Sequence, residues 1–140
     1  MVDLKEIASY AVILIIVLIA AQHLNVVVSG SMEPAFYRGD IVMVQKASFL
    51  GIQEFNVNDI QKGDVVVYDA KWYNQPVIHR VIDIVNVNGS TMYLIKGDNN
   101  NAPDPYYVSP NQIQSKVVTI GDNLVVIPKI GYLSLWLRGL

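Results

Sequence analysis

A long uncharged stretch near the N-terminus constrains this chain more than any other feature of its sequence. No formal charge occurs in residues 7–32, and the first fifteen of them are apolar except for Ser9 and Tyr10. A bilayer core requires about 20 apolar residues, with a range of about 17–25. Residues 7–24 would form a helix roughly 27 Å long at about 1.5 Å per residue. We therefore expect residues 1–24 to be a membrane anchor that spans once.

Two other interpretations of this stretch compete with an anchor. A cleaved signal peptide normally begins with a basic region, whereas residues 1–6 hold one Lys and two carboxylates. Cleavage after Ala20 or Ala21 would also leave a large residue at the third position before the cut. A helix buried in the domain core is the second alternative. The few Lys and Arg residues on either side barely discriminate the orientation.

After residue 24 the sequence changes to short β-rich runs, with Gly, Pro, Asn and Asp clustered between them. Almost no helical periodicity remains. We therefore expect residues 25–140 to form one mainly β domain, an antiparallel sheet coiled into a barrel-like shape. The whole chain of 140 residues is long enough for one such domain. The expected strands are 26–28, 41–44, 65–68, 77–84, 92–95, 116–120 and 124–127.

Two of the expected strands begin after similar tripeptides. Arg-Gly-Asp at 38–40 precedes the run at 41–44, and Lys-Gly-Asp at 62–64 precedes the run at 65–68. Gly can supply a turn position with positive φ, and Asp can accept hydrogen bonds from nearby backbone. Both tripeptides therefore predict a turn at the entrance of a strand.

Two further segments do not resemble strands. Residues 97–110 contain three Pro and three Asn, which predicts a restrained irregular loop, either a plain surface connection or part of a site. Residues 130–140 are apolar, with Tyr132, Trp136 and Arg138 among them. This segment is too short to span a bilayer, and it fits a membrane interface as well as it fits the core.

The composition excludes several classes of function. Without cysteine the chain has neither a disulfide framework nor a thiolate zinc site. His23 and His79 are 56 residues apart and lack ligand motifs, and no Gly-rich phosphate loop occurs, so we expect no metal and no cofactor. A net charge of −2 with interspersed charges does not suggest a nucleic-acid partner.

The residues able to carry chemistry are few, and each has an ordinary structural interpretation. Ser31 lies in Ser-Gly-Ser, which is usually only a turn, although Gly30 would let a substrate chain approach closely. His79 lies between Val77 and Val81 on one face of a strand, where a histidine is more often a satisfied core residue. His23, at the end of the apolar stretch, is most simply an interfacial polar residue.

Four short sequence blocks occur in a fixed order, and the set is a more specific signal than any single block. Together they resemble the conserved boxes of the type I signal peptidase family. After the apolar stretch come Ser-Gly-Ser-Met-Glu-Pro at 29–34, Lys-Gly-Asp-Val-Val-Val-Tyr at 62–68, Ile-His-Arg-Val at 78–81 and Lys-Gly-Asp-Asn-Asn at 96–100. Bacterial members have Lys directly before the Arg of the third box, whereas here His79 precedes Arg80. The chain therefore resembles the archaeal and endoplasmic-reticulum branch, which uses Ser, His and Asp; its compact size fits an archaeal enzyme.

The resemblance implies a role for each matching residue. By position, these are the nucleophile Ser31, the general base His79, the two acids Asp98 and Asp104, and the side-chain oxyanion donor Ser29. The donor role is known from the bacterial branch. Of the two acids we favour Asp104 as the one that orients the base, because a Pro on each side restricts its backbone. The sequence itself leaves that choice open.

The resemblance also implies a substrate and a location. The substrate would be a preprotein whose signal peptide is cut off after a small residue, and the catalytic domain would lie on the external face of the cell membrane. The lipid bilayer and the protein-translocation machinery are the further partners. In strand geometry Val27 shares a face with Ser29 and Ser31, so it can line a substrate pocket. We expect Gly30 and Met32 to contact the substrate as well, and for Met32 lipid contact and core packing are open alternatives.

Two rival interpretations remain open at this point. The first is a related membrane-anchored serine peptidase with a different or self-cleaved substrate. The second is a non-catalytic anchored β domain that serves interactions, in which the same Ser, His and Asp are structural.

Overall fold

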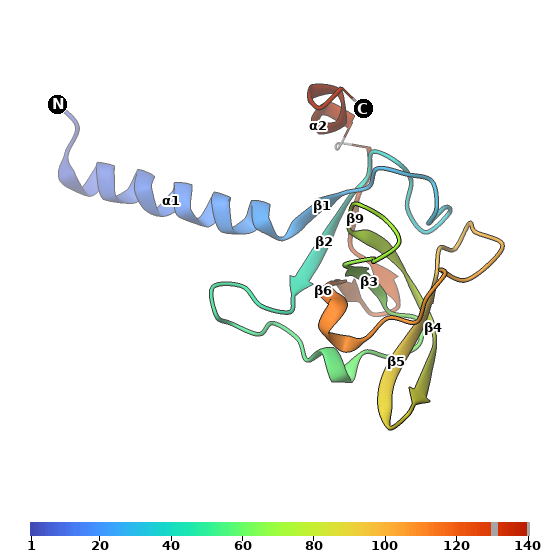
Figure 1. Cartoon of the computed structure of the whole chain (residues 1–140). Coiled ribbons are helices and arrows are strands. Elements are labelled where there is room, and N and C mark those ends of the chain that lie inside the picture. The colour runs from blue at the N-terminus through green and yellow to red at the C-terminus, as the bar shows by residue number, and fades with distance from the viewer. Residues whose placement is uncertain (130–131, 140) are drawn as a thin grey trace.

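The computed structural model describes residues 1–129 and 132–139, and its first element is an apolar helix that extends away from the rest (Figure 1). Helix α1 (Leu4–Gln22) is the one helix in the described part of the chain that is long and apolar enough to cross a membrane. None of its residues is buried in the domain. The core-helix alternative is therefore wrong, because a core helix would bury one face against the sheet.

The remainder of the described chain is mainly β, as expected. Seven strands form one antiparallel sheet in the order β1-β2-β6-β3-β4-β5, with β9 also paired to β2. Its strands are β1 (Leu24–Val26), β2 (Ile41–Lys46), β3 (Val65–Tyr68), β4 (Val77–Val87), β5 (Ser90–Lys96), β6 (Ile113–Val117) and β9 (Val126–Ile127). The other elements are the pair β7 (Thr119–Ile120) and β8 (Asn123–Leu124), the turns η1 (Val57–Asp59) and η2 (Pro110–Gln112), and helix α2 (Tyr132–Leu137). The predicted coiled antiparallel sheet after an apolar helix is confirmed.

The expected strand positions hold with four main differences, one of which is that the expected run at 124–127 is divided between β8 and β9. The first strand occupies 24–26 rather than 26–28, so the chain passes from α1 into the sheet with only His23 between them. Strand β6 begins at Ile113, which the sequence pattern missed because Gln114 and Ser115 make this run look polar. The expected run at 116–120 is divided between β6 and β7.

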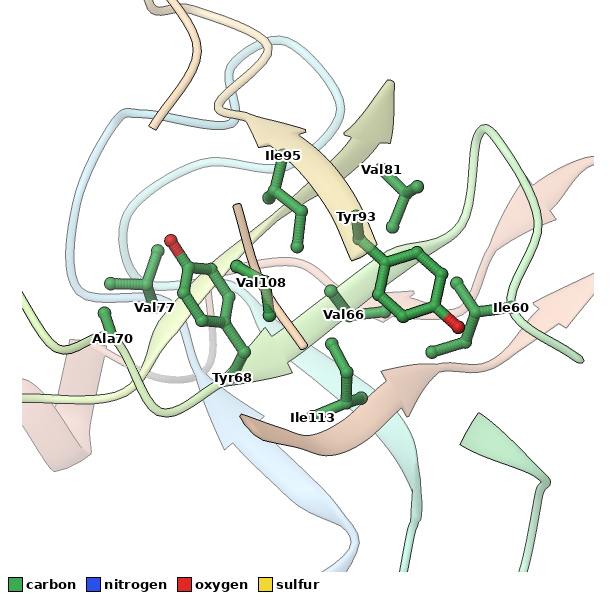
Figure 2. Packing of buried hydrophobic residues seen from close by; sticks show 10 residues of the cluster. All are labelled: Ile60, Val66, Tyr68, Ala70, Val77, Val81, Tyr93, Ile95, Val108 and Ile113. Atoms are coloured by element: carbon green, nitrogen blue, oxygen red, sulfur yellow. The ribbon is translucent and has the colours of Figure 1, made fainter. Parts of the chain in front are cut away.

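Strand β3 lies at the centre of the core and is buried on both faces. Its side chains alternate, so Val66 and Tyr68 pack in one apolar cluster and Val65 and Val67 in another. Figure 2 shows the first cluster, with the hydroxyls of Tyr68 and Tyr93 pointing to opposite ends of it. The hydroxyl of Tyr93 donates to the carbonyl oxygen of Val57, 2.6 Å away.

The two similar tripeptides form equivalent turns, as predicted. Gly39 has φ of 92° and Gly63 has φ of 95°. The carboxylate of Asp40 accepts from the backbone N–H of Tyr37, and that of Asp64 accepts from the N–H of Gln61, at 2.8 Å and 2.9 Å. Each turn therefore reverses the chain just before a central strand.

The C-terminal segment is described only in part, since 130, 131 and 140 lie outside the described residues. In α2, Leu135 is buried while Leu133, Trp136 and Leu137 are exposed. An exposed apolar and aromatic surface is compatible with the predicted membrane interface, which stays a prediction.

The turn at Gly63 generates a stability prediction. A Cβ at this position would meet no atom within 4 Å, so the cost of Gly63→Ala comes from the positive φ alone. We expect a loss of about 1–2 kcal/mol in the free energy of unfolding, measured by denaturant titration in detergent. Gly63→Asn should lose less, because Asn tolerates positive φ better than Ala. Equal stability of Gly63→Ala and the wild type would contradict this account.

Candidate active site

Ser31 and His79 are brought together by the sheet and by the segment that follows β1. The Nε2 atom of His79 lies 2.9 Å from the Oγ of Ser31. His79 pairs with Val66 across the β3–β4 ladder and points into the domain, with only 5% of its surface exposed. His79 is therefore buried, as expected of a core histidine. Its Nε2 atom, however, faces the hydroxyl of Ser31, which is only half-buried.

Asp104 lies on the other side of the imidazole. Both of its carboxylate oxygens are 2.9 Å from Nδ1 of His79, and the carboxylate is buried. The backbone N–H of Asp104 donates to the carbonyl of Ile95 at 2.8 Å, which holds the loop against β5. A carboxylate at Nδ1 selects the tautomer that carries its proton there, so that Nε2 can accept a proton from Ser31.

Tyr68 is a member of this network that the sequence did not suggest. Its hydroxyl donates to Oδ2 of Asp104 at 2.7 Å, and the side chain is fully buried. Burial raises the pKa of Tyr68 above its ordinary value, and the hydrogen bond to Asp104 raises it further, so the phenol remains a donor. The buried carboxylate therefore has a second donor besides His79. A tyrosine at the end of a buried strand gave no distinguishing signal.

Asp98 takes a different place from Asp104. Its two oxygens accept from Nε and Nη2 of Arg80, each at 2.9 Å. The same guanidinium donates through Nη1 to the carbonyl of Gly63 at 2.8 Å. The hydrogen bond to Asp98 raises the pKa of Arg80. Asp98 therefore ties the loop after β5 to β4 and contacts the neighbour of His79 rather than His79 itself.

The loop after β5 also packs directly against the segment of Ser31. The backbone N–H of Asn99 donates to the carbonyl of Ser31 at 2.8 Å, and its side-chain amide donates to the carbonyl of Gly30 at 3.1 Å. Gly97 is buried here, and a Cβ on it would lie 2.7 Å from the carbonyl oxygen of Ser31 and 3.0 Å from Nε2 of His79. No side chain fits at Gly97 without moving the site. The glycine of the Lys-Gly-Asp block at 96–98 is the sequence signal for this close packing.

Ser29 lies beside Ser31, with 3.1 Å between the two hydroxyl oxygens. The backbone N–H of Ser31 is 3.5 Å from the Oγ of Ser29. The two hydroxyls and this N–H therefore gather at one exposed spot next to His79, where a carbonyl oxygen could be bound.

A groove of about 540 Å³ opens beside these residues. One wall comes from β1 and the residues after it, and the other from the segment that leads into β4. The lining includes Ser29, Ser31 and His79, with Leu24, Val26 and Val28 on the first wall and Trp72, Tyr73, Pro76, Val77 and Ile78 on the second. Strand β1 is paired to β2 only, so one of its edges has no partner strand in the described residues.

The expectation for Val27 and Met32 needs correction. Both are core residues, exposed by 2% and 1%, and neither lines the groove. The reason is that β1 ends at Val26, so the alternation assumed for Val27 and Ser31 does not continue. Gly30 is also absent from the lining, and a Cβ there would lie 2.9 Å from the carboxylate of Glu33.

His23 is not part of this site. Its ring lies at the end of α1, where Nδ1 is 2.8 Å from the carbonyl of Ile19 and Nε2 is 2.7 Å from the carboxylate of Glu54. The hydrogen bond to Ile19, followed by that to Glu54, raises the pKa of His23. In the described residues no three His, Cys, Asp or Glu side chains are grouped so that they could hold a metal ion.

Comparison with known proteins gives consistent matches over most of the chain. The family model described as signal peptidase, peptidase S26, matches residues 3–123. An uncharacterized protein of Methanocaldococcus jannaschii is 35% identical, with 89% of this chain and 88% of that protein covered. The signal peptidase complex catalytic subunit SEC11 of Lachancea thermotolerans is 37% identical over 80% of this chain and 64% of that subunit. SEC11 of Colletotrichum graminicola is 36% identical over 80% of this chain and 62% of that subunit.

This chain thus spans slightly less than two thirds of the length of the two fungal subunits that it matches. The family match covers helix α1, the four sequence blocks and strands β1 to β7. The chain belongs to the peptidase S26 family of signal peptidases, in the branch that includes archaeal and endoplasmic-reticulum members.

Proposed function

We propose that this protein is a membrane-anchored serine endopeptidase that removes N-terminal signal peptides from preproteins, with Ser31 as nucleophile. The observation that carries the proposal is the continuous chain of contacts from Ser31 Oγ through both nitrogens of His79 to Asp104. Family membership supports the substrate class. The division into an anchor at 1–24 and a peptidase domain at 25–140 belongs to the same proposal.

The proposed reaction uses His79 twice. Its Nε2 takes the proton of Ser31 as Oγ attacks the scissile carbonyl, and the imidazolium then protonates the leaving amine. Asp104 holds the ring orientation and stabilises the positive charge that forms. In the second half of the reaction His79 takes a proton from a water molecule, which attacks the ester carbonyl of the acyl-enzyme. The imidazolium then returns the proton to the Oγ of Ser31 as that atom leaves. Asp98 acts through Arg80 and keeps the loop after β5 in place.

Ser29 and the backbone N–H of Ser31 are the proposed donors to the developing oxyanion. The Oγ of Ser29 lies 3.1 Å from the Oγ of Ser31 and 3.5 Å from its backbone nitrogen, and both serines line the groove. Donors that are already in place need no reorganisation when negative charge develops.

The substrate segment is proposed to lie extended in the groove. Within the described residues strand β1 has an unpaired edge there, to which a peptide backbone can add as a further strand. Apolar side chains on both walls would receive the side chains before the cut. We place specificity for a small residue at the position beside Ser31.

The location is proposed from α1. Eight residues lie between the end of the helix and Ser31, so a helix that spans the bilayer keeps the nucleophile close to its surface, where signal peptides emerge. We propose that this surface is the external face of the cell membrane, that α2 lies at the interface, and that the translocation machinery is a neighbour.

Replacement of the nucleophile tests the enzyme assignment. Ser31→Ala should lower the rate of preprotein cleavage in detergent by at least about 10³-fold while leaving thermal unfolding nearly unchanged, because water in the groove can replace the hydroxyl as the partner of Nε2 of His79. Ser29→Ala should retain measurable cleavage that is about 10²-fold slower. Wild-type turnover by purified Ser31→Ala would refute the peptidase proposal, and cleavage of other peptides but of no preprotein would favour a related peptidase instead.

The two acids are distinguished by the same assay. Asp104→Asn should be nearly inactive, with a loss of about 10⁴-fold, since an amide cannot stabilise the imidazolium and can impose the wrong tautomer. Asp98→Asn should lose about tenfold or less, because an amide oxygen can still accept one hydrogen bond from Arg80. Thermal unfolding of both variants separates a catalytic defect from a folding defect. A dead but stable Asp98→Asn beside an active Asp104→Asn would reverse the assignment.

Gly97→Ala tests the close packing at the site. The added methyl group must displace the side-chain amide of Asn100 and the carbonyl of Ser31, and it crowds the ring of His79. We therefore expect cleavage to fall by about 10²-fold with a stability loss of about 1–3 kcal/mol. Gly63→Ala is the matched control, because it loses stability without touching Ser31 or His79. Full activity of Gly97→Ala at a temperature where both variants are folded would show that the loop can move freely.

A further inference from the structure

Two hairpin turns of this protein have the same backbone geometry but very different residues. In the turn between β4 and β5, Asn88 and Gly89 have φ of 51° and 84°, and in the loop after β2, Leu50 and Gly51 have φ of 52° and 79°. The second turn is closed by two hydrogen bonds of 2.8 Å between the backbones of Phe49 and Ile52. Asn-Gly is the preferred pair for such turns, whereas leucine is not.

Leu50 adopts a positive φ that leucine disfavours. A bulky residue with positive φ is uncommon and costs free energy that asparagine would largely avoid. The strained turn does not bury the side chain, since Leu50 is 80% exposed and Ile52 is 64% exposed. An exposed apolar residue that is also strained has no benefit within the domain itself. Strain of this kind suggests that the residue serves a function outside it.

This apolar tip, residues 49–52, is fastened to the end of α1. The ring of Phe49 meets the ring of His23 edge to face, with 4.7 Å between centroids. Glu54 binds His23 through its carboxylate and also accepts from the backbone N–H of Lys46 at 2.6 Å. His23 in turn bonds to the carbonyl of Ile19 in the last turn of the helix. Figure 1 shows the loop after β2 extending on the same side of the domain as α1.

A positive charge lies at the base of the tip. The ammonium of Lys46 is 5.5 Å from the centroid of the Phe49 ring. Cations next to aromatic and apolar side chains are typical of segments that sit among lipid headgroups, where the charge meets phosphate and the apolar groups reach the acyl boundary. The tip therefore has both the chemistry and the position for the bilayer interface.

We propose that the apolar tip is a second membrane contact, in which Leu50 and Ile52 enter the lipid interface beside the end of α1. This proposal rests on the proposed anchoring of α1 in a bilayer. The contacts among His23, Glu54 and Phe49 set the depth of the tip relative to the helix. With two points of attachment the catalytic domain cannot tilt freely, so the groove keeps a constant orientation to the membrane.

The depth of the tip can be measured directly because the chain has no cysteine. Leu50→Cys in the full chain is labelled with an environment-sensitive fluorophore and reconstituted into vesicles of phosphatidylcholine and phosphatidylglycerol. Asn88→Cys is the matched control, since it has the same turn geometry on a hairpin that points away from α1 in Figure 1. We expect a blue-shifted emission at position 50, quenched more by lipids spin-labelled near the headgroup than by lipids labelled near the chain end. Position 88 should show neither effect.

A third label separates this proposal from the anchor. Ile13→Cys, in the middle of α1, should be quenched most by lipids labelled near the chain end. If position 13 is quenched while position 50 behaves like position 88, the second contact is refuted and the anchor stands. If position 13 is not quenched, the anchor fails and the second contact fails with it.

An exchange of the two turn residues tests the consequence for function. Leu50→Asn should fold at least as stably as the wild type in thermal unfolding, because asparagine suits the turn. It should cleave a short peptide in detergent at the wild-type rate, yet cleave a preprotein in vesicles several-fold more slowly. Asn88→Leu places the same leucine on the distant hairpin and should not change cleavage in vesicles. Equal vesicle rates for Leu50→Asn and the wild type would overturn the functional role of the tip.

Discussion

A buried imidazole with both nitrogens occupied is the feature on which the rest of this structure depends. A polar ring placed inside a core costs free energy unless each nitrogen has a partner. Here one partner is a carboxylate on the loop after β5, and the other is a hydroxyl on the segment after β1. The loop and the segment meet only because the sheet curls, and the imidazole of His79 joins them. The same contacts that satisfy the ring chemically also fix its direction.

Arg80 has a comparable role for the backbone. Its guanidinium bonds to the carbonyl of Gly63 at the entrance of β3 and to Asp98 on the loop after β5. The side chain of Arg80 thereby joins three of the four blocks that suggested the family, at 62–68, 78–81 and 96–100. The remaining block, at 29–34, is held by the backbone N–H of Asn99, which donates to the carbonyl of Ser31. The residues of these blocks are far apart in sequence but are hydrogen-bonded to one another, which explains why each block has its particular residues. They form one hydrogen-bonded frame around Ser31.

The sequence predicted the class of fold and the two strand-entry turns because these depend on local patterns. Runs of β-branched residues, turns with positive φ and a long apolar helix are all readable within a few positions. Val27 and Met32 were misplaced because the point where a strand ends depends on tertiary contacts. Tyr68 and Gly97 were missed for a related reason. Their importance comes from atoms of Asp104, Ser31 and His79, which lie far from them in sequence, and no local pattern records such distances.

The direct passage from α1 into β1 has a mechanical consequence. Only His23 separates the last residue of α1 from the first residue of β1, which is an edge strand. The carbonyl of His23 accepts a hydrogen bond from the backbone N–H of Val44 in β2. A domain on a long flexible linker would sample a wide volume above the bilayer. With α1 anchored in a bilayer as proposed, this short connection would couple the domain to its helix and keep Ser31 within a thin layer of nearly constant height. The proposed search for a scissile bond would then be a problem of lateral diffusion in two dimensions.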